Sequence, residues 1–282
     1  MSNRLSVQDI VAMKQRGERI AALTAYDYTS ARILDATDIS LILIGDTVGV
    51  VVQGAQSTLR VSLEHIIYHS QLVARGSRRA LLVGDMPFMT YQISGDEALR
   101  NAARLVCEGN VGAVKLEGGS TVCATIERLV RAGIPVCGHL GYTPQSANTQ
   151  GRPRIQGRQP ADAVTLIREA RALERAGAFA VVLELVPSSV AREISTQLSI
   201  PTIGIGAGPD CDGEIQVFHD LLGLYTDFVP RHTRRYLDGA ELMNAATKQY
   251  VNDVRSRSFP GPEQSSDLSR ETRSQLESLL RT

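Results

Sequence analysis

LILIGDTVGV, residues 41–50, is an apolar run that ends at an acid. Leu41 to Ile44 predict a buried strand, because an unbroken apolar run of this length suits a sheet that is covered on both faces. Gly45 opens a turn, and Asp46 follows where the chain leaves the strand. The stretch therefore predicts a strand with a carboxylate at its carboxyl end.

Similar apolar runs recur along the chain, and segments with helical periodicity separate most of them. They lie at 20–26, 40–46, 80–85, 112–117, 134–139, 179–184, 201–206 and, as the weakest of the set, 223–229. Amphipathic stretches between them close on Gly109, Gly133 and Gly177, where helix C-terminal caps belong. The pattern predicts an α/β fold, a (β/α)8 TIM barrel; an open doubly wound sheet is the alternative.

The domain organisation follows from the length of 282 residues, which one α/β barrel can fill. We expect a single catalytic domain over residues 1–260, with an N-terminal helix that Ser6 and Asp9 cap. Residues 143–162 are too many for an ordinary loop and predict an excursion over one mouth of the barrel. Residues 261–282 form a polar tail that we expect to be disordered or docked on a neighbour.

Charge and cysteine content limit the partners. Thirty basic and thirty acidic residues cancel, and no long basic run occurs, so neither nucleic acid nor an anionic membrane is expected as a partner. Small molecules or other protein chains remain. Four cysteines without CxxC spacing, and the absence of a secretory or membrane-spanning apolar run, predict a cytoplasmic protein.

Ionisable residues stand at the predicted carboxyl ends of five strands: Asp46, Asp85, Lys115 with Glu117, His139, and Glu184. In a TIM barrel these ends share one mouth, where such enzymes carry out their chemistry. Carboxylates meeting there would repel one another unless positive charge lay between them, and a hard divalent cation such as Mg²⁺ would supply it. For any single acid, a helix cap or a salt bridge is the alternative role.

Three further features are less specific. His139 is either a hydrogen-bonded core residue or a contact of the metal or substrate, and Lys115, in an apolar run, predicts pairing with an acid or an anionic substrate. GIGAG, residues 204–208, lacks the spacing of a dinucleotide loop, which leaves close approach of a ligand or simple packing. No HExxH or paired Cys/His spacing occurs, which argues against zinc.

At these residues the sequence resembles the ketopantoate hydroxymethyltransferase (3-methyl-2-oxobutanoate hydroxymethyltransferase) family. The resemblance covers about residues 20 to 260, and the last twenty or so residues lie outside it. The matching stretches are TAYDY (24–28), GDTVG (45–49), VQGAQSTL (52–59), DMPFM (85–89), VKLEGG (114–119), PVCGHLGYTPQS (135–146), QGR (156–158), LELVP (183–187) and IPTIGIGAG (200–208).

The resemblance implies a TIM-barrel enzyme of pantothenate biosynthesis, typically a decamer. Such an enzyme uses Mg²⁺ to transfer a hydroxymethyl group from 5,10-methylenetetrahydrofolate to 3-methyl-2-oxobutanoate. By motif, the resemblance implies metal positions, some of them through water, at Asp46, Asp85 and Glu117. It implies Glu184 as the general base and keto-acid contacts from Asp46, Thr47, Asp85 and Lys115, with His139 in support. Thr47 departs from the family's usual Ser; its extra methyl group crowds the substrate carboxylate.

The expected chemistry suits these residues. A cation that chelates the carboxylate and keto oxygens of the substrate stabilises the enolate that forms when Glu184 removes a proton from carbon 3. One rival function is a Mg²⁺-dependent keto-acid lyase or mutase of the phosphoenolpyruvate and isocitrate lyase type, whose KKCGH-like loop is missing here. Another is a catalytically silent binding barrel, against which the acids at the strand ends count.

Overall fold

Eight short strands pair in parallel in chain order, and β1 also pairs with β8, so that the sheet closes into a barrel. The structure, a computed structural model, describes residues 4–281. The predicted TIM barrel is thereby confirmed and the open sheet is excluded. The strands are β1 Ile20–Thr24, β2 Leu41–Ile44, β3 Leu81–Asp85, β4 Ala113–Lys115, β5 Val136–Gly141, β6 Ala180–Glu184, β7 Thr202–Ile205 and β8 Gly213–Gln216.

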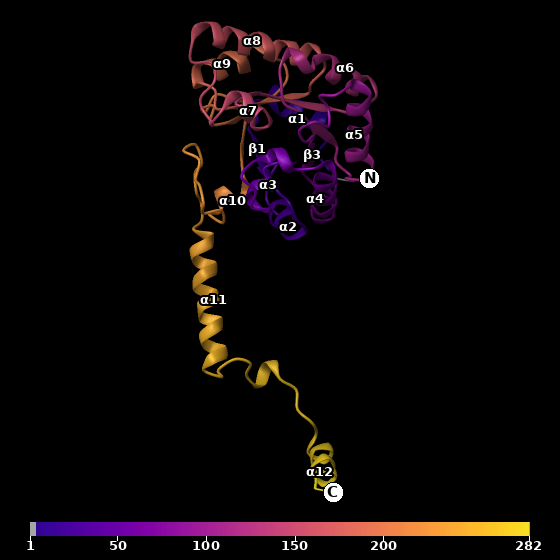
Figure 1. Cartoon of the computed structure of the whole chain (residues 1–282), viewed down its shortest axis with the longest axis vertical. Coiled ribbons are helices and arrows are strands. Elements are labelled where there is room, and N and C mark those ends of the chain that lie inside the picture. Colours follow the sequence, from indigo (N-terminus) through magenta and orange to yellow (C-terminus); the bar gives the residue numbers. More distant parts are fainter. Residues whose placement is uncertain (1–3, 282) are drawn as a thin grey trace.

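Helices follow most strands and cover the outside of the barrel (Figure 1). The α-helices are α1 Val7–Gln15, α2 Tyr28–Asp35, α3 Val48–Val51, α4 Leu63–Gly76, α5 Gly95–Cys107, α6 Cys123–Arg131, α7 Ala147–Gln150, α8 Pro160–Arg175, α9 Ser188–Gln197, α10 Phe218–Leu221, α11 Gly239–Arg255 and α12 Arg270–Leu279. Short 3₁₀ helices lie at η1 Thr58–Arg60, η2 Ser120–Val122, η3 Pro144–Ser146 and η4 Pro262–Gln264.

Two apolar cores explain why the strands are apolar on both faces. Along β2, Leu41 and Leu43 belong to a core that includes Ile10 of α1, whereas Ile42 and Ile44 belong to the core shared with the surrounding helices. Successive side chains of a strand point to opposite faces. One alternating set of residues therefore fills the inside of the barrel, and the other set packs against the helices. Because both sets are apolar, the strand appears in the sequence as an unbroken run of apolar residues.

The expected N-terminal helix is α1. The hydroxyl of Ser6 accepts a hydrogen bond from the Asp9 amide, and the Asp9 carboxylate accepts one from the Ser6 amide, as a capping box requires. Ile10, on the inward side of the helix, is fully buried in the inner core. This helix therefore contributes directly to the packing inside the barrel.

The prediction of an eighth strand at 223–229 is wrong. The strand is β8, Gly213–Gln216, and the chain at 223–229 forms no strand. In β8, Gly213 and Ile215 are buried whereas Glu214 is exposed, because no long helix follows to cover the outer face of this strand. An apolar run was thus the wrong signal for a strand that is covered on one face only.

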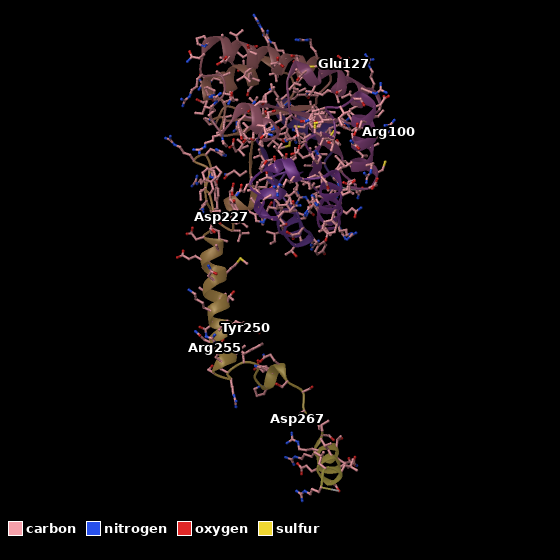
Figure 2. All side chains as sticks on the ribbon, in the orientation of Figure 1. Arg100, Glu127, Asp227, Tyr250, Arg255 and Asp267 are labelled. Carbon is pink, nitrogen blue, oxygen red and sulfur yellow. The ribbon has the colours of Figure 1, made fainter. Side chains whose placement is uncertain are left out.

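After α10 the chain leaves the barrel (Figure 1), and α11 and α12 stand apart from it with their side chains projecting away (Figure 2). Among the described residues of α11 only Gly239 is buried, and none of α12 is. The division at residue 260 and the disorder of 261–282 stay predictions; in the described part of that segment lie η4 and α12. Within residues 4–281, no helix is both long and apolar enough to cross a bilayer.

Gly141, at the end of β5, has a positive φ of 93°, and a Cβ there would overlap the main-chain oxygen of Glu184. Gly133 has a similar φ of 86° but open space around it. We expect Gly133→Ala to lower the free energy of unfolding by about 1–3 kcal/mol through backbone strain alone. Gly141→Ala should cost about 1–3 kcal/mol more, because the added methyl group has no room. Urea unfolding of both variants measures the difference; equal losses would mean that the β5–β6 contact relaxes freely.

Candidate active site

All seven residues predicted for the site line one cavity of about 50 Å³ at the carboxyl ends of the strands: Asp46, Thr47, Asp85, Lys115, Glu117, His139 and Glu184. The period of the strands explains four of these positions. Asp85, Lys115, His139 and Glu184 each lie two residues beyond an inner-core residue of the same strand, namely Val83, Ala113, Cys137 and Val182. Each side chain therefore points to the inside of the barrel, and together they form a polar layer above the apolar inner core.

Lys115 is buried beside two of the carboxylates. Its Nζ donates to both oxygens of Asp85, at 2.8 and 2.9 Å, and lies 3.7 Å from Oε1 of Glu117. Burial by itself disfavours the charged amine, but Asp85, Glu117 and Asp46 outweigh it and raise the pKa of Lys115 above its ordinary value. Lys115 is therefore a fixed cation, which confirms the expected pairing with an acid.

His139 lies between two carboxylates. Its Nδ1 is 3.3 Å from Oε1 of Glu117, and its Nε2 is 3.3 Å from Oε2 of Glu184. Burial and Lys115 favour the neutral ring, yet these two carboxylates raise the pKa of His139 to about 9. The same proximity, together with Lys115, overcomes burial and lowers the pKa of Glu117. At neutral pH the ring is protonated, so His139 serves as a second fixed positive charge.

Asp46 has no comparable cation. Within residues 4–281 it forms no ion pair, and its carboxylate accepts one hydrogen bond, at Oδ2, from Nε2 of Gln145 at 3.0 Å. The main-chain amide of Asp46 donates to Oδ2 of Asp85 at 3.3 Å, which brings the two acids together. Burial and the charges of Asp85 and Glu117 raise the pKa of Asp46 well above its ordinary value. The site therefore contains a buried carboxyl group whose ionised form has no ion-pair partner among residues 4–281.

This arrangement fits a hard cation. Asp46 and Asp85 both line the cavity and offer oxygen ligands, and added positive charge would relieve the repulsion that raises the pKa of Asp46. Mg²⁺ commonly takes only one or two carboxylates and completes its shell with water and substrate oxygens. Over the described part of the chain, no group of three or more His, Cys, Asp or Glu side chains is arranged so that it could hold a metal ion. A two-carboxylate site is consistent with that finding.

The sequence did not reveal Gln145 and Tyr91, which hold the site together. Gln145 lies in η3, within the predicted excursion over the mouth, and the hydroxyl of Tyr91 donates to its amide oxygen at 2.7 Å. The Tyr91 hydroxyl also accepts from the main-chain amide of Glu117 at 3.2 Å. Both side chains are uncharged, so a search for ionisable residues at strand ends passes over them. The available signal for Gln145 was its place in PVCGHLGYTPQS (135–146), one of the stretches that carry the family resemblance.

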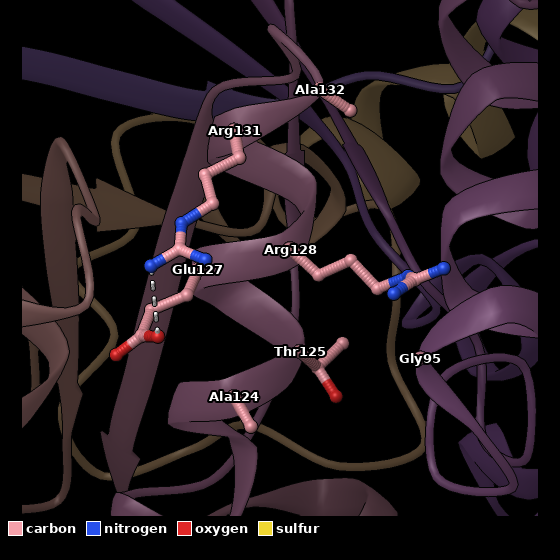
Figure 3. A pocket seen from close by; sticks show the side chains of 7 residues that line it. All are labelled: Gly95, Ala124, Thr125, Glu127, Arg128, Arg131 and Ala132. Atoms are coloured by element: carbon pink, nitrogen blue, oxygen red, sulfur yellow. Dashed lines mark ion pairs between the residues drawn. The ribbon is translucent and has the colours of Figure 1, made fainter.

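A larger hollow, of about 590 Å³, lies on the outer surface near α6 (Figure 3). Arg128 and Arg131 border it, and these exposed side chains pair with Asp96 and Glu127 respectively. No buried ionisable group lines this hollow. Buried ionisable residues line the cavity at the barrel mouth instead.

A closed (β/α)8 barrel with buried acids and a lysine at the carboxyl ends of its strands defines the class of TIM-barrel enzymes. Residues 4–262 match the sequence profile described as ketopantoate hydroxymethyltransferase. A 3-methyl-2-oxobutanoate hydroxymethyltransferase of Chloroflexus aurantiacus is 53% identical over 265 residues, 94% of each chain. One from Magnetococcus marinus is 50% identical over 94% of this chain and 99% of its own. The chain belongs to the ketopantoate hydroxymethyltransferase family and is an enzyme, a hydroxymethyltransferase.

Solved structures with the same fold are far less similar in sequence. A phosphonopyruvate hydrolase, in a complex with oxalate and Mg²⁺, superposes with a TM-score of 0.62 at 12% identity, over 100% of this chain and 97% of its own. A phosphoenolpyruvate phosphomutase from Streptomyces platensis gives 0.61 at 12% identity, over 98% and 97%. At this level of identity the likeness concerns the fold alone.

Proposed function

We propose that this enzyme transfers a hydroxymethyl group from 5,10-methylenetetrahydrofolate to 3-methyl-2-oxobutanoate, giving 2-dehydropantoate for pantothenate biosynthesis. The observation that carries the proposal is the meeting of Asp46, Asp85, Lys115 and Glu184 at one cavity. Relatives at 53% and 50% identity, named for the same keto acid, support it.

Asp46 and Asp85 would hold Mg²⁺, and Glu117 would contact it through water. When bound, the ion supplies Lewis acidity toward the carboxylate and keto oxygens of the substrate. Lys115, held by Asp85 at 2.8 Å, places a permanent positive charge beside the same oxygens. Thr47, which lines the cavity, would contact the substrate carboxylate.

Glu184 would take the proton from carbon 3 of the keto acid. Its side chain is 18% exposed, against 2% for Asp85 and Glu117, so it is the open carboxylate of these three. Nε2 of His139 lies 3.3 Å from Oε2 of Glu184, which places a positively charged ring beside this carboxylate. The electron pair left on carbon 3 forms the new carbon–carbon bond with the folate methylene carbon, and water supplies the hydroxyl group as tetrahydrofolate leaves.

The direct test is formation of 2-dehydropantoate from the two substrates, with Mg²⁺ and after its removal by EDTA. We expect product with Mg²⁺ and a loss of activity with EDTA that added Mg²⁺ restores. A parallel reaction without the folate separates transfer from cleavage of the keto acid. Equal activity after complete metal removal would contradict the proposed metal site.

Thr47 provides a finer test of the same site. It precedes α3 and makes no capping hydrogen bond through its side chain, so its hydroxyl does not cap that helix. We expect Thr47→Ser to change the free energy of unfolding by less than about 1 kcal/mol while lowering KM for the keto acid. Steady-state kinetics and urea unfolding measure both effects; an unchanged or raised KM would show that the methyl group does not crowd the substrate.

We also propose that the chain forms a homo-oligomer, a decamer by family resemblance. The support is α11, which stands away from the barrel (Figure 2). Its side chains Leu242, Met243 and Tyr250 are more than half exposed. Exposed apolar side chains on a helix that stands away from the barrel mark a surface for protein–protein contact. We propose that a second copy of the chain covers this surface. Analytical ultracentrifugation gives the size.

A further inference from the structure

Gln145 lies over the barrel mouth and is buried, with a relative exposure of 4%. Its side-chain nitrogen, Nε2, donates one hydrogen bond to Oδ2 of Asp46, at an N···O distance of 3.0 Å. It donates a second to the main-chain oxygen of Met86, at 2.9 Å. Its amide oxygen accepts from the Tyr91 hydroxyl at 2.7 Å. Every polar atom of this side chain is thus engaged.

The orientation of the amide is fixed by its neighbours. The Met86 carbonyl can only accept a hydrogen bond, and so can the ionised Asp46 carboxylate that would bind a cation, so the nitrogen faces these two groups and the oxygen faces Tyr91. A flipped amide would set its oxygen against two acceptors in a buried site. The side chain therefore holds Oδ2 of Asp46 in one direction and leaves Oδ1 for a ligand.

The main chain of the same residue orients a second acid. The Gln145 amide donates to Oε2 of Glu117 at 3.0 Å, while no hydrogen bond reaches Oε1 of Glu117 in the described structure. One residue thus engages one oxygen on each of two carboxylates. Because Gln145 is neutral, it orients both acids without cancelling the negative charge that a cation needs.

We infer that Gln145 is a positioning residue, whose side chain holds the Asp46 carboxylate in the direction required for divalent-cation binding. The inference rests on the proposed function, since it takes Asp46 and Asp85 as the metal carboxylates. Gln145 itself reaches the cation only through Asp46. Groups that orient a metal ligand in this way commonly change metal affinity by about 10–100-fold when removed.

The chain offers a matched control in the same loop. Gln150 of α7 fastens this loop through two hydrogen bonds to Thr143, at 3.1 and 3.0 Å, without touching a carboxylate. Gln145→Met and Gln150→Met make the same chemical change, and both remove side-chain hydrogen bonds that hold the loop. Of the two side chains, Gln145 contacts Asp46 and Gln150 does not. Tyr91→Phe, which frees the amide oxygen of Gln145, serves as a milder variant.

The measurement is Mn²⁺ binding to the full chain without substrates, followed by the electron paramagnetic resonance signal of free Mn²⁺. Gln145→Met should weaken Mn²⁺ binding about 10–100-fold. Gln150→Met should stay within about twofold of the parent, and Tyr91→Phe should fall between them. In the transfer assay, Gln145→Met should need more Mg²⁺ for half-maximal rate and keep most of its kcat at saturating Mg²⁺.

The outcomes separate this inference from the proposed function. If the parent binds Mn²⁺ and Asp46→Asn does not, while Gln145→Met binds as the parent does, only the inference is overturned. Equal losses in Gln145→Met and Gln150→Met would also overturn it, because loosening the loop would then explain both. Mn²⁺ binding by neither the parent nor Asp46→Asn overturns the metal site and this inference together. Should Gln145→Met fail to fold, an unchanged Mn²⁺ affinity in folded Tyr91→Phe decides against it.

Discussion

Glu184→Gln is expected to lose about 10²–10⁴-fold in the rate of proton removal from carbon 3 of 3-methyl-2-oxobutanoate. The substitution keeps the shape of the side chain at the end of β6 but removes its basic oxygen. Asp46, Asp85 and Lys115 remain, so binding of Mg²⁺ and of the keto acid should persist. The expected defect is therefore in kcat for proton transfer, with little change in substrate affinity.

The measurement is deuterium exchange at carbon 3, followed by NMR with Mg²⁺ and without folate, which isolates proton removal from one-carbon transfer. Glu214→Gln is the matched control, because Glu214 lies exposed on β8, outside the residues that line the cavity. It should exchange at the parental rate. If Glu184→Gln exchanged deuterium at the parental rate, another group would be the proton acceptor. His139 would be the first residue to test. The Glu184 carboxylate helps to raise the pKa of His139, so its removal makes this ring easier to deprotonate.

Asp46→Asn and Asp85→Asn should each abolish tight binding of Mg²⁺ and of the keto acid together, because the substrate completes the coordination shell. Their effects on stability without metal should differ. Asp85→Asn removes the carboxylate that holds the buried Lys115, and breaking such a pair costs about 3–5 kcal/mol. Asp46→Asn removes a buried charge that its neighbours repel, so it should leave the free energy of unfolding unchanged or increase it.

Isothermal titration calorimetry measures binding, and urea unfolding in EDTA measures stability. Asp38→Asn, at an almost fully exposed residue ahead of β2, should match the parent in both. Retained keto-acid binding in both site variants would place the cation elsewhere. A loss of stability in Asp46→Asn would mean that the ionised carboxylate is favourably held.

The same reasoning gives a pH dependence for the metal-free protein. The folded-state pKa of Asp46 lies above its value in the unfolded chain, near 3.9. The folded state therefore holds this proton more tightly, and the stability it confers is lost as the pH rises through the folded-state pKa. Asp46→Asn should lose this contribution to the pH dependence.

The sequence by itself determined the barrel and most of its mouth. Strand runs that are apolar on both faces require cover inside and outside, and that requirement produced the eight-stranded closed sheet. Because parallel strands present their carboxyl ends together, residues as distant as Asp46 and Glu184 could be assigned to one site. The exception was β8, whose outer face lacks a helix and whose residues therefore lack the apolar run.

Only the tertiary structure decided how the charges at that mouth are matched. Lys115 pairs with Asp85 on the neighbouring strand, His139 lies between Glu117 and Glu184, and Asp46 accepts a hydrogen bond from the neutral Gln145. Asp46 and Gln145 are 99 residues apart, and uncharged Gln145 and Tyr91 have no periodic signal. Hydrogen-bond direction and desolvation act over a few ångströms, so these pairings depend on coordinates that strand and helix patterns do not specify.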